Sequence, residues 1–324
     1  MKNNNLVPVS LIIPTCNRHD DLLNTISSYL SASTLPAEII IVDQSDEDVF
    51  NNTKKDLTSK LSRYSISLKI IRLDEKSLTK ARNIGLCHAT NNIIIFSDDD
   101  IELFEDTVLN TYSLMLSPEY VMCGALDKNT HLNGSKLKIL VSCLIGRKEW
   151  KQRHIGCVSK SVYGSYPYEQ LKGETETRWA MGYFFSIKKD FATQNKLLFD
   201  EKLSAYSYAE DLDFTYRYWK SASLKKLHCV LSPKIVVGHL ASLNNRLPTQ
   251  MMFIKECVNR LYLSYKLFPK SRLSRAAYHY SNYWTGIRLL FKKRYFKMWL
   301  NACRIASKHK KELSKGVINE AMYI

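Results

Sequence analysis

The chain has 324 residues, a length that holds one large α/β domain or roughly two domains of ordinary size. Hydrophobic residues make up 45% of the sequence and charged residues 24%, which is typical of folded proteins and excludes disordered, collagen-like and multi-span membrane classes. The 47 Lys and Arg residues exceed the 31 Asp and Glu residues by 16, so a negatively charged partner has to be considered.

The first hundred residues alternate between short apolar runs and longer segments of helical length. The apolar runs are rich in Ile and Val, which suits strands buried on both faces of a parallel sheet. The expected strands are residues 9–14, 38–42, 68–73 and 92–96, and the expected helices are residues 20–31, 48–61 and 77–89. This order predicts a doubly wound, mostly parallel α/β sheet flanked by helices.

Polar segments follow three of the expected strands, at residues 15–18, 43–45 and 98–100. The carboxyl ends of parallel strands meet at one edge of a sheet, where ligands bind in folds of this kind. We therefore expect these three segments to converge on one site.

Three consecutive aspartates follow the fourth expected strand: Asp98, Asp99 and Asp100. Three carboxylates that face one another without a cation are electrostatically unfavourable. A divalent cation would relieve the repulsion, and oxygen ligands select Mg²⁺ or Mn²⁺. The alternative is a solvated acidic turn that caps the next helix, but the position directly after a buried strand favours a metal site.

Two other charged residues have both a functional and a structural interpretation. Arg82, near the start of the expected helix 77–89, either binds a phosphate or is an exposed cation of that helix. Asp43, at a strand end, either accepts a hydrogen bond from a base or ribose or is a turn residue.

A helix is expected over residues 208–220, and three carboxylates lie near its start. Glu210 has capping-box spacing from Ser207, and Asp213 precedes an arginine by four residues, the spacing of an ion pair on a helix. Asp211 has no structural explanation of this kind. The helix dipole keeps a carboxylate in the first turn ionised, which suits a base that accepts a hydroxyl proton.

Outside that helix the pattern beyond residue 120 is less regular. The Gly- and Tyr-rich residues 163–173 are expected to form a loop. His239 follows an apolar strand at residues 234–238. It is either a hydrogen-bonded structural residue or a third ligand that completes a metal site begun by carboxylates.

The positive charge is concentrated in residues 249–324, which contain 16 Lys and Arg residues against three acidic residues. The segment also mixes Trp, Tyr and Phe with the basic residues, as in IRLLFKKRYFKMWL at residues 287–300. This composition predicts helices that lie on an anionic membrane surface without crossing it. The alternative is that these helices pack on the rest of the protein and that their charges are solvated.

The sequence gives no sign of secretion or of a membrane span. Residues 1–20 lack a signal-peptide pattern, and the longest apolar stretch, residues 137–146, is too short to cross a bilayer. The eight cysteines include no C-x-x-C pair. We expect a reducing, cytoplasmic location, with the protein peripheral at the cytoplasmic face of the membrane.

Six segments, taken together and in order, resemble glycosyltransferase family 2. The segments are VSLIIPTCNR, IIIVDQSD, LTKARNIG, IIIFSDDD, RWAMGYFFSIKKDF and AEDLDFTYR with a later histidine, and they span residues 8–240. The resemblance implies a GT-A fold over residues 1–248, with a nucleotide-binding half at about 1–125 and an acceptor-binding half at about 126–248. Residues 249–324 would be a basic helical extension. It also implies transfer of a sugar from a nucleoside diphosphate donor with inversion at the anomeric carbon.

The resemblance assigns roles to individual residues. Pro14, Thr15, Asn17 and Arg18 match the nucleotide-contacting loop, Asp43 the residue that faces the base, and Arg82 the arginine near the donor. Asp98 and Asp100 match the D-x-D motif, with Asp100 as the principal metal ligand, His239 as a third ligand and Asp99 on the substrate. Asp211 matches the catalytic base beside Glu210, and Trp179 and Gly182 lie near the sugar and the acceptor.

The chain departs from the family pattern in two places. Lys76 and Ser77 stand where the family often has a glycine, and no Q-x-x-R-W motif follows the helix 208–220. The missing motif disfavours processive polymer synthesis. We expect a UDP-sugar donor, a saccharide or lipid-linked saccharide acceptor, and a role in surface polysaccharide synthesis.

Two other functions are weighed against this one. A nucleotidyltransferase that forms sugar nucleotides would also use an α/β sheet and a metal, but its phosphate loop is normally glycine-rich and basic, unlike TCNRHDD. The aromatic and basic residues 249–324 would suit a nucleic-acid-binding protein, but the sequence contains no known nucleic-acid module, and we expect no nucleic-acid partner.

Overall fold

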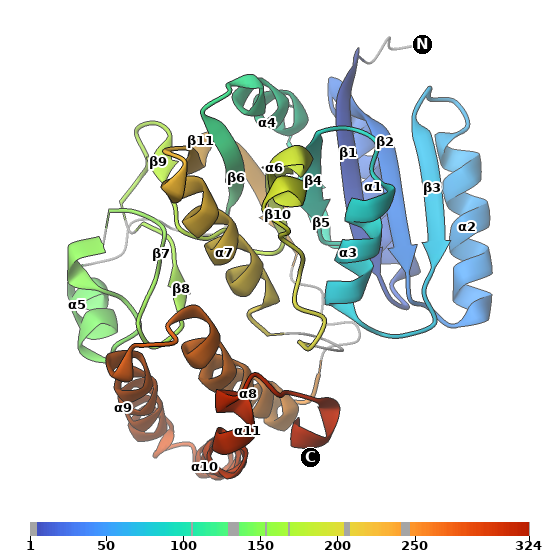
Figure 1. The fold of residues 1–324 in the computed structure, drawn as a ribbon. Coiled ribbons are helices and arrows are strands. Elements are labelled where there is room, and N and C mark those ends of the chain that lie inside the picture. The colour runs from blue at the N-terminus through green and yellow to red at the C-terminus, as the bar shows by residue number, and fades with distance from the viewer. Residues whose placement is uncertain are drawn as a thin grey trace.

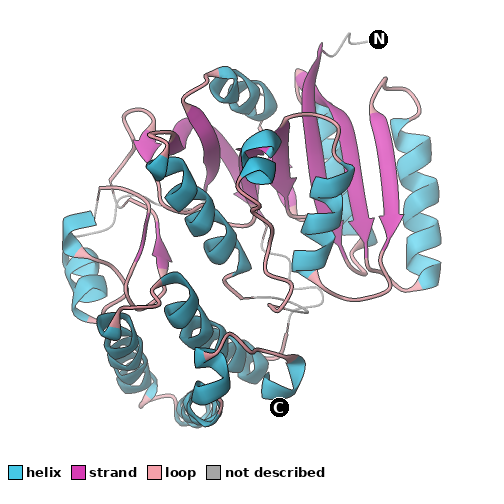
Figure 2. Ribbon diagram, viewed as in Figure 1, coloured by secondary structure: helices cyan, strands magenta, loops and turns pink. Residues whose placement is uncertain are grey.

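The computed structural model describes residues 5–104, 106–128, 136–152, 154–167, 169–203, 208–240 and 247–323. Its centre is a mixed sheet flanked by helices (Figure 1 and Figure 2). The strands of this sheet are β1 (Asn5–Thr15), β2 (Thr34–Asp43), β3 (Ser67–Arg72), β4 (Ile93–Ser97), β5 (Ile101–Leu103), β6 (Tyr120–Asp127), β9 (Thr175–Glu176), β10 (Phe184–Lys188) and β11 (His228–His239).

The helices fall between these strands and after them. They are α1 (His19–Ser31), α2 (Glu47–Leu61), α3 (Leu78–His88), α4 (Thr107–Leu116), α5 (Lys136–Leu144), α6 (Lys189–Gln194), α7 (Glu210–Leu224), α8 (Thr249–Leu267), α9 (Arg272–Leu289), α10 (Lys293–Lys308) and α11 (Lys310–Ser314). Short 3-10 helices are η1 (Trp150–Gln152) and η2 (Glu320–Tyr323), and β7 (Cys157–Val158) pairs with β8 (Gly164–Ser165). Among the described residues, no helix is both long enough and apolar enough to cross a membrane.

The strand order β3-β2-β1-β4-β10-β6-β11-β5 confirms the α/β fold class, with a sheet that is parallel in its first half. Strands β3, β2, β1 and β4 pair in parallel, as the alternating order of strands and helices predicts. Strand β10 then inserts antiparallel between β4 and β6. Every strand and helix expected in the first hundred residues is present, with ends within a few residues of the prediction.

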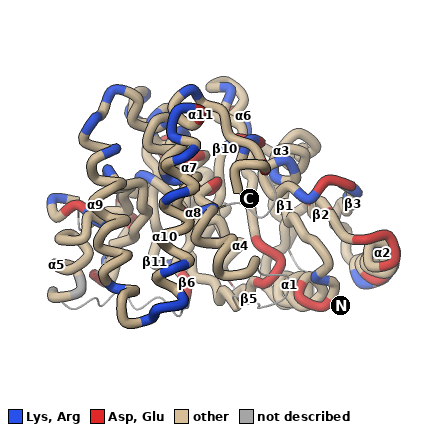
Figure 3. The backbone as a smooth tube through the Cα atoms, turned by 90° about the horizontal axis from the view of Figure 1, so that it is seen from below, with Lys and Arg blue, Asp and Glu red and all other residues tan. Residues whose placement is uncertain are grey.

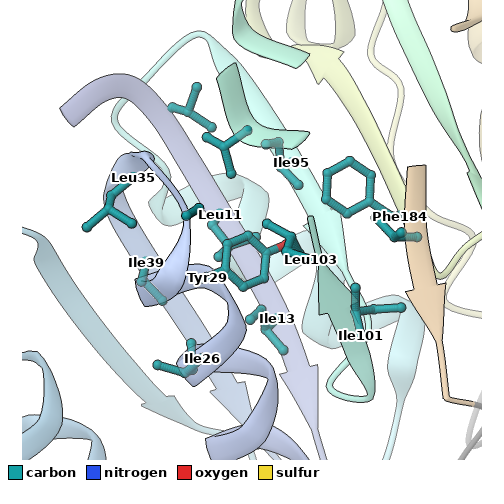
Figure 4. Close-up of a cluster of buried hydrophobic side chains, with 14 of the residues drawn as sticks. Leu11, Ile13, Ile26, Tyr29, Leu35, Ile39, Ile95, Ile101, Leu103 and Phe184 are labelled. Carbon is teal, nitrogen blue, oxygen red and sulfur yellow. The ribbon is translucent and has the colours of Figure 1, made fainter. Parts of the chain in front are cut away.

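Successive residues of β1 enter two different cores, which is why the strand is apolar throughout. Leu11 and Ile13 pack on one face with Ile26 of α1 (Figure 4). Ile12, between them, packs on the opposite face with Phe214 of α7. The two cores hold β1 in place, so the position of its carboxyl end is fixed.

Gly85 allows α3 to lie close to the sheet. A methyl group at this position would collide with the side chain of Ile12. The start of α3 is therefore brought near the carboxyl end of β4, where the aspartates lie.

The basic residues 249–324 fold as helices that share a core with the rest of the protein. Ile254, Cys257 and Leu261 of α8 pack in one cluster with Trp179 and with Leu212 of α7. The alternative that these helices pack on the rest of the protein therefore holds for the helix faces that enter this core. The division of the chain at residue 248 stays a prediction.

Two local expectations are wrong. The helical spacing of Ile287, Leu290, Phe291 and Arg294 predicts one stripe on a single helix over residues 287–300. In the structure α9 ends at Leu289 and α10 begins at Lys293, so these residues do not share one helix. Residues 163–173 are not all loop, since β8 lies within them and Tyr166 is buried. In the first case the break reverses the chain, so that α9 and α10 both pack against α8.

Candidate active site

A cavity of about 880 Å³ opens at the carboxyl ends of β1 and β4 and at the amino-terminal end of α7. The sequence-predicted site residues that line it are Pro14, Thr15, Asn17, Arg18, Arg82, Asp98, Asp99, Asp100, Gly182, Glu210, Asp211 and His239. Segments far apart in the sequence therefore meet at one edge of the sheet, as expected. The predicted residues Asp43 and Trp179 do not line this cavity.

Asp98, Asp100 and His239 form a group that could hold a metal ion. Their ligand atoms all lie within 4.8 Å of one another. His239 Nε2 is 3.4 Å from Asp100 Oδ1, and the imidazole stacks on the ring of Tyr183 with a centroid distance of 5.2 Å. Strand β11 pairs with β5, and this pairing places His239 opposite Ile101. Ile101 is the residue that follows Asp100, so the pairing brings His239 to the aspartates.

The charges of this group favour a cation. Burial raises the pKa of Asp98, the Asp100 carboxylate raises it further, and Arg82 opposes both effects. Two oxygen ligands and one imidazole are a ligand set that suits a divalent ion. The donor atoms of these residues therefore fit the metal site that the sequence predicts.

Asp99 contacts the loop after β1, and it shares Arg18 with Asp100, whose Oδ2 lies 3.6 Å from Arg18 Nη1. The Asp99 carboxylate accepts hydrogen bonds from Thr15 Oγ1 at 2.7 Å and from Arg18 Nη1 at 2.9 Å. Burial raises its pKa to about 7, and the Arg18 charge opposes the shift. Asp99 thus holds the loop between β1 and α1, and through this loop it positions residues that line the cavity.

Asn17 joins that loop to the loop after β2. Its backbone has φ of 53°, a left-handed conformation that asparagine adopts more readily than most residues. Its backbone N–H donates to Ser45 Oγ at 2.7 Å, and its side-chain amide exchanges two hydrogen bonds of 2.9 Å with Asp46. The cavity wall formed by β1 and β2 is therefore cross-linked.

Arg82 connects the metal group to the start of α7. Its side chain is 1% exposed, which excludes the exposed helix cation considered from the sequence. The guanidinium donates to Asp98 and to the carbonyl of Gly182, both at 3.0 Å, and to Glu210 at 3.1 Å. These three contacts occupy both terminal nitrogens, so Arg82 organises carboxylates as well as lining the cavity.

Glu210 is held by this arginine and not by a capping box, so the capping interpretation is wrong. Helix α7 begins at Glu210, with Ala209 as its N-cap in a left-handed conformation with φ of 65°. Glu210 is therefore the first helical residue and not the third. Ser207 lies outside the described residues. The expected ion pair of Asp213 with Arg217 is present at 2.7 Å.

Asp211 lies at the wall of the cavity with both carboxylate oxygens positioned by backbone groups. The N–H of Gly182 donates to Oδ2 at 2.8 Å, and the N–H of Leu212 donates to Oδ1 at 2.7 Å. Burial raises its pKa to about 7 and the Glu210 charge adds to this, while Arg82 and the two backbone N–H groups oppose it. A carboxylate has about four lone-pair sites, so Asp211 can still accept a proton.

Asp43 and Trp179 are buried near the site but do not reach the cavity surface. Asp43 Oδ1 accepts the N–H of Ser45 at 2.8 Å, whereas its buried Oδ2 has no hydrogen-bond partner among the described residues. Trp179 is 7% exposed, and its indole N–H donates to the carbonyl of Ser165. Trp179 therefore supports the wall from behind.

Twelve other residues line the cavity without a role assigned to them individually from the sequence, although Cys16, Gln44 and Met181 lie in segments that were expected at the site. The twelve are Cys16, Gln44, Lys76, Ser77, Leu78, Asp127, Met181, Tyr183, Tyr208, Ala209, Leu247 and Met252. Gln44 lies within an expected polar segment and orders the start of α3 by accepting the N–H of Ser77. Asp127 ends β6, a strand that the irregular pattern beyond residue 120 did not predict. No local signal identifies Met252 of α8.

Comparison with known proteins gives a family and a fold. The family model described as glycosyl transferase family 2 matches residues 10–190. The crystal structure of GalNAc-T7 with UDP, GalNAc and Mn²⁺ superposes with a TM-score of 0.56 at 17% identity and covers 82% of this chain. This chain spans only 51% of that protein. A mannosyltransferase from Pyrobaculum calidifontis, in complex with GDP-Man and Mn²⁺, gives a TM-score of 0.53 at 12% identity over 93% of this chain and 75% of its own.

Proposed function

The chain belongs to glycosyl transferase family 2, and we propose that it transfers a sugar from a nucleoside diphosphate sugar to a hydroxyl group of an acceptor. One observation carries this proposal. Asp211, a carboxylate with its pKa raised to about 7, lines the same cavity as the possible metal group of Asp98, Asp100 and His239. A base for the acceptor and a cation site for the leaving diphosphate are the two parts that the reaction needs.

We propose that Asp98, Asp100 and His239 hold a divalent cation. When bound, it would neutralise the negative charge that develops on the diphosphate as the sugar leaves. Either Mg²⁺ or Mn²⁺ suits the two carboxylates, and the imidazole favours Mn²⁺ because Mg²⁺ prefers oxygen ligands. The Mn²⁺ in the two similar solved structures supports this choice.

We infer a UDP-sugar as the donor. The loops after β1 and β2 line the end of the cavity nearest Asp43. Asp43, which the family resemblance places opposite the base, lies behind this wall, so its unsatisfied Oδ2 would accept an N–H group of a base such as uracil only after the wall rearranges. UDP in the GalNAc-T7 crystal structure is compatible with this assignment, whereas the similar mannosyltransferase binds GDP-Man, so nucleotide choice has to be measured.

Asp211 is proposed to take the proton of the acceptor hydroxyl as its oxygen attacks the anomeric carbon. The attack comes from the side opposite the diphosphate, so the configuration inverts and no covalent intermediate with the protein forms. The N–H groups of Gly182 and Leu212 hold the carboxylate in place for this step. Arg82 fixes the neighbouring Glu210 so that it does not compete for the same proton.

We propose a saccharide or lipid-linked saccharide as acceptor, non-processive transfer, and a cytoplasmic location against the membrane. The charge of residues 249–324 supports a membrane surface as partner. A role in surface polysaccharide synthesis agrees with such an acceptor. The competing nucleic-acid function is weakened because Tyr278 and Trp299, two of the aromatic residues that suggested it, are buried in the core.

Product analysis tests the proposal directly. The purified chain, incubated with UDP-sugars, Mn²⁺ and saccharide acceptors, should release a nucleoside diphosphate. Pyrophosphate release on mixing a sugar phosphate with a nucleoside triphosphate would instead identify a nucleotidyltransferase. The matched variants are Asp211→Asn and Asp190→Asn, the second being an exposed first-turn carboxylate of α6 that does not line the cavity.

Asp211→Asn changes hydrogen bonding as well as basicity. Its amide has one acceptor oxygen, so one of the two backbone N–H donors would face an NH₂ group, at a cost of about 1–3 kcal/mol. The variant should therefore be assayed at a temperature below its own melting temperature. Transfer should fall at least ~10²-fold while donor affinity changes only a few-fold. Unchanged transfer in Asp211→Asn would exclude this residue as the base.

A further inference from the structure

The turn between α9 and α10 presents an apolar side chain almost completely to solvent. Phe291 is 98% exposed, and the preceding residue, Leu290, is 48% exposed. A fully exposed phenylalanine next to an exposed leucine contributes nothing to the folded core. Such a pair indicates a contact surface only where it belongs to a larger exposed apolar patch.

The helices on either side of the turn already bury an apolar stripe of their own. Tyr278 of α9 is 2% exposed and Trp299 of α10 is 1% exposed, and both belong to the core that contains α8. The exposed residues of the turn lie outside this packing. Their exposure is therefore not explained by an inner face that was left incomplete.

Helix α5 extends the exposed apolar surface. The hydroxyl of Tyr280 donates to the carbonyl of Leu144 at 2.7 Å, so the end of α5 contacts α9. Figure 1 shows the two helices next to each other. Leu140 and Leu144 are 45% and 58% exposed, and Tyr280 and Tyr283 of α9 are 47% and 65% exposed. We call the surface formed by Leu140, Leu144, Tyr280, Tyr283, Leu290 and Phe291 the apolar-basic face.

The chain segment that supplies most of this face is rich in positive charge. Residues 257–311 contain 14 Lys and Arg residues and no Asp or Glu. Four of the basic residues, Arg288, Lys292, Lys293 and Arg294, are exposed at the turn itself. Figure 3 shows basic segments along α9, α10 and α11, whereas acidic segments lie mainly over α1 and α2.

We propose that the apolar-basic face binds the surface of an anionic phospholipid bilayer. Phe291 and Leu290 would enter the interface between headgroups and acyl chains, and Lys292, Lys293 and Arg294 would lie on the lipid phosphates. Exposed leucines are not needed for binding nucleic acid, which uses aromatic stacking and charge. A second copy of the chain is disfavoured because two strongly basic faces repel each other.

The position of α8 links this face to the active site. Met252 of α8 lines the cavity, and the same helix packs against α9 and α10. Docking would therefore hold the cavity at a fixed position relative to the bilayer, where a lipid-linked acceptor is available. Only this last step rests on the proposed function, since vesicle binding needs no catalysis.

Vesicle co-sedimentation of the full chain tests the proposal. Vesicles of phosphatidylcholine alone are compared with vesicles that also contain phosphatidylglycerol, at low and high salt. The apolar variant is Phe291→Ser, and its matched control is Leu224→Ser, which replaces an 83% exposed leucine at the end of α7. The charge variant is Lys292→Glu with Lys293→Glu. Its control reverses two adjacent exposed lysines of α2, Lys54 and Lys55.

The wild-type chain should bind only the anionic vesicles, and salt should weaken the binding. Phe291→Ser should lower the partition coefficient by about ten-fold or more. The charge variant should lower it by at least about thirty-fold, because it removes two lysines and adds two repelled carboxylates. Both controls should stay within about two-fold of the wild type, roughly the spread expected of neutral surface changes. Circular dichroism confirms that each variant is folded.

Four results would overturn the proposal. The first three are equal binding to both kinds of vesicle, equal losses in variants and controls, and binding to a DNA duplex but not to vesicles. The fourth, a concentration-dependent dimer that Phe291→Ser abolishes, without vesicle binding, would assign the face to self-association instead. Release of nucleoside diphosphate with a soluble acceptor and no vesicles should be unchanged in Phe291→Ser. Failure of vesicle binding is thus distinguishable from failure of the proposed function.

Discussion

Replacing Arg82 by methionine tests the central contact network of the site. Methionine keeps much of the length of the side chain but removes the charge and all donors. Glu210, whose side chain is 8% exposed, then loses its positively charged partner. The side chain of Asp98 is 29% exposed, so water stabilises its charge in part and the loss of Arg82 costs less free energy there. Breaking a buried ion pair by removing one partner costs about 3–5 kcal/mol. Because the Glu210 pair dominates, we expect the free energy of unfolding to fall by about 3 kcal/mol.

Urea denaturation followed by circular dichroism, in the presence of a chelator, measures this loss without a contribution from bound metal. The double variant Arg82→Met with Glu210→Gln removes the uncompensated charge and should regain at least ~1 kcal/mol relative to the single variant. Arg82→Lys should rescue only part of the loss, since an ammonium cannot reach all three acceptors with the fork geometry of a guanidinium. A loss below 1 kcal/mol in Arg82→Met, or a double variant less stable than the single one, would refute the reasoning.

Three further predictions concern the same cavity. Because burial and Glu210 raise the pKa of Asp211 to about 7, the base is protonated at lower pH. The transfer rate should therefore rise as pH increases through about 7, and a flat profile would argue against this base. Gly182→Ala should reduce transfer in a folded protein, because the added methyl group would lie 3.2 Å from both Arg82 Nη2 and Asp211 Cβ. The control is Gly173→Ala, whose methyl group meets nothing within 4 Å and should leave transfer unchanged. Asp100→Ala should abolish the rise in melting temperature that Mn²⁺ with UDP gives the wild type, and a full rise in the variant would contradict its role as a ligand.

The parallel half of the sheet could be predicted from sequence because its signals are local. Each strand there is an unbroken apolar run, and each helix between strands has ordinary length, so β1 to β4 follow from composition and order. Strand β10 was not predicted as a strand. Its antiparallel place depends on pairing with β4, about ninety residues earlier, and with β6, about sixty residues earlier. Pairing at such distances leaves no periodic signal in the segment itself.

The site could be predicted as a set of residues but not as a set of contacts. Twelve assigned residues do line one cavity, because strand ends converge in any sheet of this kind. Local spacing misled the interpretation of Glu210, whose partner is Arg82, 128 residues away. A buried carboxylate such as Glu210 needs a positively charged partner, and a hydrogen bond to a helix cap does not supply one. The distant ion pair therefore decides the position of Glu210, and the local capping pattern does not.

The packing of α8 also decides how the C-terminal helices can be studied. The side-chain amide of Asn259 donates to the carbonyl of Tyr208, and its oxygen accepts the hydroxyl of Tyr323, so α8 and η2 together support the segment that leads into Asp211. Met252 adds part of the cavity wall. Truncation near residue 248 would therefore remove the proposed membrane-binding residues and damage the candidate active site in the same step. Only substitutions on the exposed surface, such as Phe291→Ser, separate the two effects, because they leave the inner faces of these helices unchanged.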